Sequence, residues 1–392
     1  MSYKKLLIAN IKYSKFLYNL YYFIGSGLLY FLRLFIHQDE KLILFSSFGG
    51  KKYDDSPRAI YEKMINDKRF NQLRIVWAFM CPQYHEIPVG EKVVIDSIKF
   101  YKLALKARIW VTNSSMERGL SFKHKKTFCL NTWHGTPIKK MGSDVKKSDK
   151  SFRKKGKNST NIMLAQSKWE ADIFSQVFKI PSENFRITGL PRNDILANYT
   201  THERLEIRKK LGIPKDKKVI LYAPTFREYN SSSLGVKLVL PINFKKWEDV
   251  LHKKGYFLLF RAHYEVSQLM TIKENNFVHN MSDYPVLDDL MIASDILISD
   301  YSSILFDYSI MDKPMICFCY DFDKYEQERG MYFDIRDYLD HVENEDDLLS
   351  LLLSIDTDKS VDKTIKFRNR FVTEYGEATS KTLDIISKEL NI

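Results

Sequence analysis

A histidine lies in the run Asn131-Thr132-Trp133-His134-Gly135-Thr136-Pro137, directly after an apolar stretch that is typical of a buried strand. Gly135 lets the backbone approach a ligand closely, and Thr136 and Pro137 suit the cap and first position of a helix. An imidazole is the side chain best matched to taking a proton from an alcohol near neutral pH. We therefore predict that His134 is a general base in a strand-to-helix turn. A histidine that merely packs or caps there is the alternative.

Two further expected strands end in groups that could bind phosphate. The first leads into Tyr222-Ala223-Pro224-Thr225-Phe226-Arg227, and the guanidinium of Arg227 can hold two phosphate oxygens without losing its charge. The second ends in Phe260-Arg261-Ala262-His263, where alternation along a strand points Arg261 and His263 to one side. A cation beside an imidazole suits a pyrophosphate leaving group. Pro224, Thr225, Arg227 and Arg261 are thus candidate donor-binding residues, together with Gly135 and Thr136 of the histidine run. His263 is a second catalytic candidate.

The run Ser299-Asp300-Tyr301-Ser302-Ser303 stands between an expected strand and an expected helix. Serine hydroxyls and free amides at a helix start form an anion site, so Asp300, Ser302 and Ser303 join the donor-binding candidates. Ordinary helix capping would use the same residues. Ser282 precedes another helix, and its hydroxyl is a weaker candidate for holding the ribose or the base.

Two other sequence patterns give weaker evidence of function. Asp321-Phe322-Asp323 has the form of a divalent-metal motif, but no other acidic cluster joins it, and we predict neither a metal nor a cofactor. The basic run 139–157 lacks interleaved aromatic residues for base stacking apart from Phe152. It favours an anionic acceptor or a membrane surface over nucleic acid, with a solvated loop as the alternative.

The elements that must position these residues form two series of short apolar runs alternating with helical stretches. The first series has expected strands at 42–48, 73–79, 92–95, 109–113 and 127–132, with helices at 57–65, 98–106 and 168–177. The second has strands at 218–222, 256–260, 295–299 and 314–319, with helices at 244–253, 287–292, 304–311, 345–352 and 379–390. Such alternation indicates α/β domains with parallel sheets, in which ligands bind beyond the carboxyl ends of the strands. We predict two Rossmann-like domains facing a central cleft, at 41–197 and 198–392.

The amino-terminal segment 1–40 is rich in aromatic and aliphatic residues and carries Lys4, Lys5, Lys12 and Lys15. We predict a helical segment that lies in the membrane interface, with its lysines on anionic headgroups. A spanning helix, a cleaved signal peptide and a helix that packs on a domain are the alternatives. Asn19, Gly25 and Arg33 argue against a span.

The composition limits the number of domains, the class of partner and the cellular compartment. The 392 residues suffice for two domains, and 61 Lys and Arg against 49 Asp and Glu give a net charge of +12. This surplus favours nucleic acid, phosphorylated substrates or an anionic membrane face as a partner. Cys81, Cys129, Cys317 and Cys319 match no zinc or redox spacing, so we expect buried free thiols in the cytoplasm.

Taken together, the motifs resemble the CDP-glycerol glycerophosphotransferase family, whose members build teichoic-acid-type polymers in bacterial envelopes. The resemblance covers roughly residues 40 to 390 and rests on runs in a matching order: Phe48-Gly49-Gly50 with Tyr53 and Pro57-Arg58-Ala59, Trp133 to Pro137, Gly189 to Asp194, Ala223 to Arg227, Arg261 to His263, and Ser299 to Ser303.

The resemblance implies a GT-B-like pair of domains, a CDP-activated polyol phosphate donor and no required metal. It implies that His134 is the base and that Arg227, His263, Ser302 and Ser303 bind the donor phosphates. The expected partners are CDP-glycerol, a polyprenyl-diphosphate-linked glycan acceptor and the cytoplasmic face of the cell membrane. CDP-ribitol as donor, a nucleotide-sugar glycosyltransferase and a nucleic-acid-binding module are the alternatives. The acceptor, the number of units added and a possible homo-oligomer stay open.

Overall fold

The computed structural model describes residues 14–145, 159–225, 231–232, 235–236, 241–262 and 274–392. The chain divides into two compact units. Unit 1 comprises Met1–His134, Ser148–Asp194 and Glu377–Ile392, and unit 2 comprises Gly135–Lys147 and Ile195–Gly376. Each unit is built on its own parallel sheet, which confirms the predicted α/β class.

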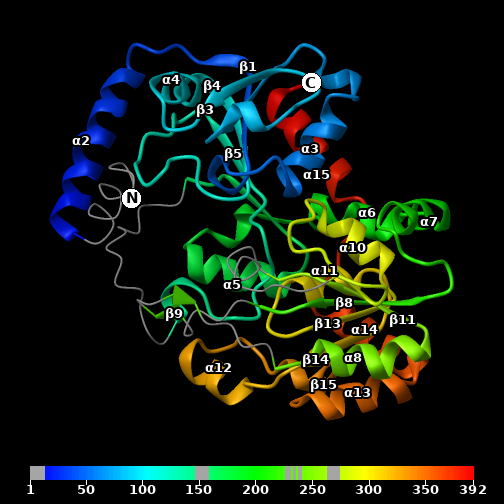
Figure 1. Ribbon diagram of the computed structural model, residues 1–392. Helices are drawn as coiled ribbons and strands as arrows, with labels where there is room; N and C mark the ends of the chain where they lie inside the picture. Colours follow the sequence, from blue (N-terminus) through cyan, green and yellow to red (C-terminus); the bar gives the residue numbers. More distant parts are fainter. Residues whose placement is uncertain (1–13, 146–158, 226–230, 233–234, 237–240, 263–273) are drawn as a thin grey trace. The chain divides into compact units, whose positions relative to one another are not determined.

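Unit 1 contains a seven-stranded sheet in the order β3-β2-β1-β4-β5-β6-β7, with every neighbouring pair parallel (Figure 1). Its helices and strands are α2 (Lys15–Arg33), β1 (Asp39–Ser46), α3 (Asp55–Met64), β2 (Arg74–Phe79), β3 (Glu91–Val94), α4 (Ile98–Lys106), β4 (Ala107–Thr112), β5 (Phe128–Asn131), β6 (Ile162–Ala165), α5 (Lys168–Phe178), β7 (Phe185–Ile187) and α15 (Ala378–Leu390).

Both faces of this sheet are buried, because alternate residues of each strand point to opposite sides. Leu42 and Leu44 of β1 join a core cluster with α4 and with Leu29 of α2. Ile43 and Phe45 join a second cluster, with Ile60, Tyr61 and Met64 of α3 and Leu383 and Ile386 of α15. Helices on both faces explain why the central strands are apolar throughout rather than alternating.

Unit 2 contains a six-stranded parallel sheet in the order β12-β11-β8-β13-β14-β15 and a small antiparallel β9-β10 pair. Its elements are α6 (Asp194–Asn198), α7 (Thr201–Lys210), β8 (Lys218–Ala223), β9 (Ser231–Ser232), β10 (Gly235–Val236), α8 (Phe244–Leu251), β11 (Tyr256–Phe260), β12 (Val278–Asn280), α10 (Leu287–Ala293), β13 (Ile296–Ser299), α11 (Ile304–Ser309), β14 (Met315–Phe318), α12 (Phe322–Glu328), β15 (Asp340–Val342), α13 (Glu345–Ser354) and α14 (Thr357–Phe371). Trp247 of α8 and Leu348 of α13 pack in its main core cluster.

The structure divides the chain differently from the predicted boundaries at both ends. The segment 198–392 was expected to be one domain, but α15 returns to unit 1, where Leu383 and Ile386 pack with α3. The segment 1–40 was expected to stand apart, but α2 packs on unit 1 through Tyr18 and Leu29. Of the thiols expected to be buried, Cys81 is exposed, and the other three are buried.

Candidate active site

His134 follows β5 at the carboxyl edge of the unit 1 sheet, beside the loops that leave β1 and β4. Its Nδ1 lies 2.7 Å from the backbone oxygen of Asn113. A carbonyl oxygen can only accept a hydrogen bond, so Nδ1 carries the proton. In the neutral imidazole the lone pair is then on Nε2, which is the form that a general base needs.

Two aromatic rings lie against the imidazole. The ring centroid of Trp133 is 4.2 Å from that of His134 in a stacked arrangement, and that of Phe48 is 5.5 Å away. The residue as a whole remains exposed, so a substrate can reach it. Lost hydration of the ring nevertheless lowers the pKa of His134 below its ordinary value of 6.5, which outweighs the opposing effects of the Asn113 carbonyl and the Asp55 carboxylate. The imidazole is therefore largely neutral at pH 7.

The backbone around His134 holds several non-glycine residues in the left-handed region. Trp133 has φ of 51°, Phe48 has 48° and Asp55 has 64°. Side chains lock these turns, since Asn113 Oδ1 accepts from Phe48 N at 2.7 Å and Asn131 Oδ1 accepts from Trp133 N at 2.9 Å. Each such conformation costs about 1–3 kcal/mol and tends to cluster at functional sites. The concentration of strain here supports the prediction for His134.

An ion pair also influences the electrostatics of His134. Arg192 Nη1 lies 3.1 Å from Asp55 Oδ2, and the two side chains are only 11% and 7% exposed. Both charges act on the pKa of His134, in opposite directions. Sequence reasoning missed this pair and the role of Asn113. The runs Gly189–Asp194 and Phe48–Ala59 are among the motifs that carry the family resemblance, but nothing in them indicated that residues 55 and 192 meet.

In unit 2, a buried carboxylate joins two of the predicted phosphate-binding loops. Asp300 is 2% exposed, and its oxygens accept from Thr225 N at 3.0 and 3.1 Å. Ser299 Oγ donates to the backbone oxygen of Ala223 at 2.7 Å. The carboxyl ends of β8 and β13 are thus held together, so Asp300 positions Thr225 and the half-buried Pro224.

The serines of this region lie at the start of α11. Ser302 and Ser303 are half-buried, and Ser302 Oγ accepts from Ile304 N at 3.4 Å, while Ser303 makes no side-chain cap bond. Within the same unit, a Cβ at Gly135 would lie 3.0 Å from Ser303 Oγ, so glycine permits this close approach. Thr136 next to it is buried. Unit 2 therefore gathers Gly135, Thr136 and Ser303.

Two other donor-site candidates have structural partners. Arg261 Nη1 donates to the backbone oxygens of Met281 at 3.2 Å and Tyr284 at 2.6 Å, which anchors the loop after β12. Ser282 Oγ accepts from Ala262 N at 3.0 Å and donates to Asn280 Oδ1 at 2.7 Å. Arg227, His263 and most of the basic run 139–157 lie outside the described residues, so their predicted roles stay predictions.

In the acidic motif after β14, Asp321 forms a hydrogen bond within unit 2. Asp321 Oδ1 accepts from the Tyr301 hydroxyl at 3.3 Å. Within the part of the chain that the structure describes, no group of three or more His, Cys, Asp and Glu side chains is placed to hold a metal ion.

Each unit has a parallel sheet with candidate site residues at its carboxyl edge: a neutral histidine in unit 1 and hydroxyl-rich loops in unit 2. The family of CDP-Glycerol:Poly(glycerophosphate) glycerophosphotransferases matches residues 28–388. The chain belongs to this family.

Two relatives illustrate the range of lengths in the family. The teichoic acid glycerol-phosphate transferase of Staphylococcus aureus is 31% identical over 378 residues, which are 89% of this chain and 94% of that protein. The teichoic acid poly(glycerol phosphate) polymerase of Staphylococcus epidermidis is 36% identical over 310 residues, covering 74% of this chain. The match spans only 42% of the length of that polymerase.

A solved structure of the wall teichoic acid polymerase TagF has a TM-score of 0.81 and 32% sequence identity, and the match covers 90% of each chain. A variant of TagF soaked with CDPG gives the same values. The UDP-GlcNAc 2-epimerase of Neisseria meningitidis, at 12% identity, 88% and 99% coverage and a TM-score of 0.52, shares the fold alone.

Proposed function

We propose that this chain transfers glycerol phosphate from CDP-glycerol to a lipid-linked teichoic-acid or related envelope-polymer precursor and releases CMP. Membership of the glycerophosphotransferase family supports the reaction type. The single observation that carries the mechanism is the hydrogen bond from His134 Nδ1 to the backbone oxygen of Asn113, which leaves Nε2 free to accept a proton.

The reaction then needs one base and a site for the leaving group. The acceptor hydroxyl gives its proton to His134 Nε2 while its oxygen attacks the β-phosphorus of CDP-glycerol. The new P–O bond forms as the bond to the bridging oxygen breaks, and CMP leaves with that electron pair. Transfer of this kind depends on positioning and on stabilising charge, so no covalent intermediate on the protein is required.

The donor phosphates are assigned to unit 2. Thr225, whose amide is held by Asp300, and Ser302 and Ser303 at the start of α11 supply hydroxyl groups that suit an anion. Arg227 and His263 are proposed to add charge to this site. No metal ion has a part in the proposal.

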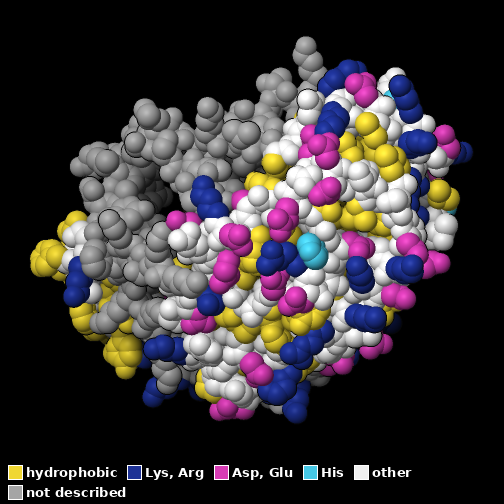
Figure 2. Space-filling view, turned by 90° about the horizontal axis from the view of Figure 1, so that it is seen from below, with side chains coloured by type: hydrophobic (Ala, Val, Ile, Leu, Met, Phe, Trp, Pro, Cys, Tyr) yellow, Lys and Arg dark blue, Asp and Glu magenta, His cyan; other side chains and the backbone are white. Residues whose placement is uncertain are grey.

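The acceptor is assigned to a membrane surface on the cytoplasmic side. None of the described helices has the length and apolar character needed to cross a bilayer. One side of α2 nevertheless exposes large hydrophobic side chains, including Phe16, Phe23, Ile24 and Phe31. Yellow side chains gather at the left edge of Figure 2, on the side where α2 lies in Figure 1. An exposed apolar helix face of this kind suits the interface of a bilayer.

CDP-ribitol is the second candidate donor, because the teichoic acid ribitol-phosphate primase of Bacillus spizizenii also matches, at 27% identity over 371 residues. Purified chain should be offered CDP-glycerol, CDP-ribitol and UDP- or GDP-sugars together with a lipid-linked acceptor. We expect acceptor-dependent CMP release with CDP-glycerol, and mass spectrometry would count the units added. Turnover of a nucleotide sugar but of neither CDP-polyol would contradict the proposal.

A further inference from the structure

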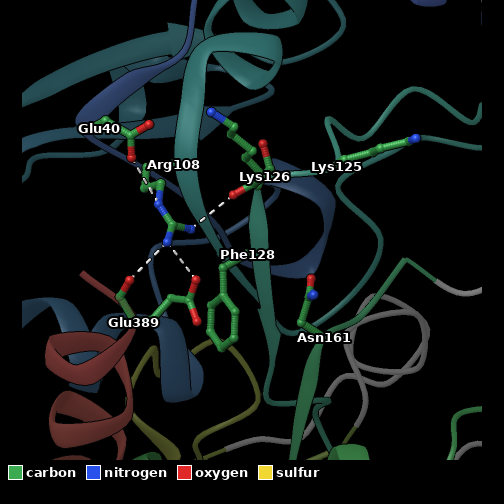
Figure 3. Close-up of a pocket in the computed structure, with 8 residues that line it drawn as sticks. Glu40, Arg108, Lys125, Lys126, Phe128, Asn161 and Glu389 are labelled. Carbon is green, nitrogen blue, oxygen red and sulfur yellow. Dashed lines mark hydrogen bonds and ion pairs between the residues drawn. The ribbon is translucent and has the colours of Figure 1, made fainter. Parts of the chain in front are cut away.

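A hollow opens at the amino-terminal edge of the unit 1 sheet, opposite the edge that carries His134. Its volume is ≈ 430 Å³. The strand starts and the loops before them line it, together with the end of α15 (Figure 3); the lining residues are Glu40, Arg108, Lys125, Lys126, Thr127, Phe128, Asn161 and Glu389. Nothing in the proposed reaction uses this hollow.

The carboxylates of the hollow are already paired, whereas its lysines are not. Arg108 Nε lies 3.0 Å from Glu40 Oε2, and Arg108 Nη2 lies 2.6 Å from Glu389 Oε1. Lys125 and Lys126 are exposed, and neither ammonium group has an acidic partner among the described residues. The lining has three cations, Arg108, Lys125 and Lys126, against the two glutamates, so its net charge is +1. The two exposed lysine ammonium groups beside the side chain of Asn161 form a combination that suits a phosphate group.

The helix α2 runs from one edge of the sheet to the other. Near its start, Tyr21 donates to the backbone oxygen of Arg118 at 3.4 Å, and the Arg118 guanidinium lies against Gly49, next to Phe48. At its end, Arg33 Nη1 donates to the backbone oxygen of Lys123 at 2.9 Å. Its 19 residues span about 28 Å at 1.5 Å per residue.

The end of α2 connects directly to the hollow. Lys123 Nζ donates to Asn161 Oδ1 at 2.7 Å, and Asn161 lines the hollow. Burial, with the charges of Arg33 and Lys126 next in weight, lowers the pKa of His124 in the same loop. Beyond Arg33 the chain exposes Leu34 and Phe35, at 66% and 67%. Exposed apolar side chains and lysines without an acidic partner among the described residues therefore lie at the same edge of unit 1.

We propose that the hollow at Lys125 and Lys126 binds the phosphate headgroup of an anionic phospholipid while the exposed face of α2 lies in the same bilayer surface. The inference rests on the proposed membrane location of the enzyme and adds a lipid class and a site. Because α2 joins the two sheet edges, a bilayer along it would reach the loops around His134 at one end and the hollow at the other. The headgroup site would fix the orientation of unit 1 on the membrane.

The test is flotation of the full chain with vesicles of phosphatidylcholine alone and of phosphatidylcholine with phosphatidylglycerol. The double variant Lys125→Ala/Lys126→Ala should bind the anionic vesicles about 20- to 30-fold more weakly, since each lysine near an anionic surface contributes roughly a fivefold factor. Its binding to neutral vesicles should not change, because α2 is intact. The double variant Lys253→Ala/Lys254→Ala removes two adjacent exposed lysines from unit 2 and serves as the matched control.

Equal losses in both double variants would mean that the attraction is diffuse and would overturn the inference. It would also be overturned if the Lys125/Lys126 variant bound anionic vesicles as tightly as the wild type does. Failure of the wild-type chain to bind either vesicle type would overturn it as well. CMP release with a short soluble acceptor, measured on the same samples, should be unchanged in all of them. If the wild type released no CMP in this assay, the result would instead count against the proposed function.

Discussion

Unit 1 and unit 2 hold the loops that carry their candidate site residues in place by different interactions. In unit 1, the loops around His134 contain left-handed residues, Phe48, Asp55 and Trp133, held in place by Asn113 and Asn131. In unit 2, the described parts of the loops after β8 and β13 contain no residue with positive φ. There the buried carboxylate of Asp300 ties the loops together.

This difference follows from what each loop must do. The proposed base, His134, must direct one lone pair at one hydroxyl, which is consistent with a cost of about 1–3 kcal/mol of backbone strain at each residue that holds it in place. A phosphate accepts hydrogen bonds from many directions, so an unstrained loop with correctly placed hydroxyl donors suffices for the proposed donor site. Substitutions in the loops of unit 1 should therefore mainly lower kcat. Substitutions in the loops of unit 2 should mainly weaken donor binding.

Loss of His134 gives the largest expected effect. His134→Ala should lower kcat by about 10²- to 10⁴-fold, the usual cost of losing a general base, while CDP-glycerol binding stays within a few-fold. Steady-state kinetics and calorimetry separate the two. His202→Ala, an exposed histidine on α7, is the control and should behave like the wild type. A His134 variant that keeps half of the wild-type turnover would make the residue structural.

Asp300 should act on the donor side instead. Asp300→Ala leaves the Thr225 amide without its charged acceptor, which costs about 1.5–3 kcal/mol, and we expect this as a higher KM for CDP-glycerol and a lower Tm. Asp300→Asn keeps one acceptor oxygen and should recover part of the loss. If the change fell on kcat alone, with KM unaltered in both variants, the positioning role would be wrong.

The acid limb of the pH–rate profile should report the environment of His134. The protonated imidazole cannot accept a proton, so the rate falls as pH drops through the pKa of His134. Lost hydration lowers that pKa, so the wild type should stay active below pH 6.5. Phe48→Ala opens one side of the ring to water, and the limb should move up toward 6.5. A limb that stays in place would show that Phe48 does not limit hydration of the imidazole.

The sequence predicted the elements with strong patterns and missed those without them. The structure has α4 and β11 with the predicted bounds, because apolar runs and a serine cap mark them. In contrast, α7 has no buried residue, so no apolar periodicity could reveal it, although Thr200 and Glu203 form a capping box. The short edge strand β7 exposes Arg186 and Ile187 and gave no signal either.

Long-range pairings were beyond the sequence for a different reason. The site histidine was identifiable because Trp133–Pro137 is a contiguous run with its own local chemistry. The Asp55–Arg192 pair joins residues 137 positions apart, and α15 crosses back to unit 1 after the whole of unit 2. One sequence carries no information on which distant segments meet when several apolar faces are equally suitable.

The smallest expected effect tests whether α2 belongs to unit 1, using two glycines of the same helix. A Cβ at Gly25 would lie 2.8 Å from Leu120 Cδ2, whereas one at Gly27 would meet nothing within 4 Å. Replacing glycine by alanine inside a helix normally stabilises it by about 0.8–1 kcal/mol. Gly27→Ala should gain this amount in the free energy of unfolding of unit 1, and Gly25→Ala should gain less or lose stability because the buried Leu120 must move. Chemical denaturation of both variants gives the difference directly. If α2 were released from unit 1 in solution, Leu120 would not oppose the new methyl group, and the two variants would be equally stable.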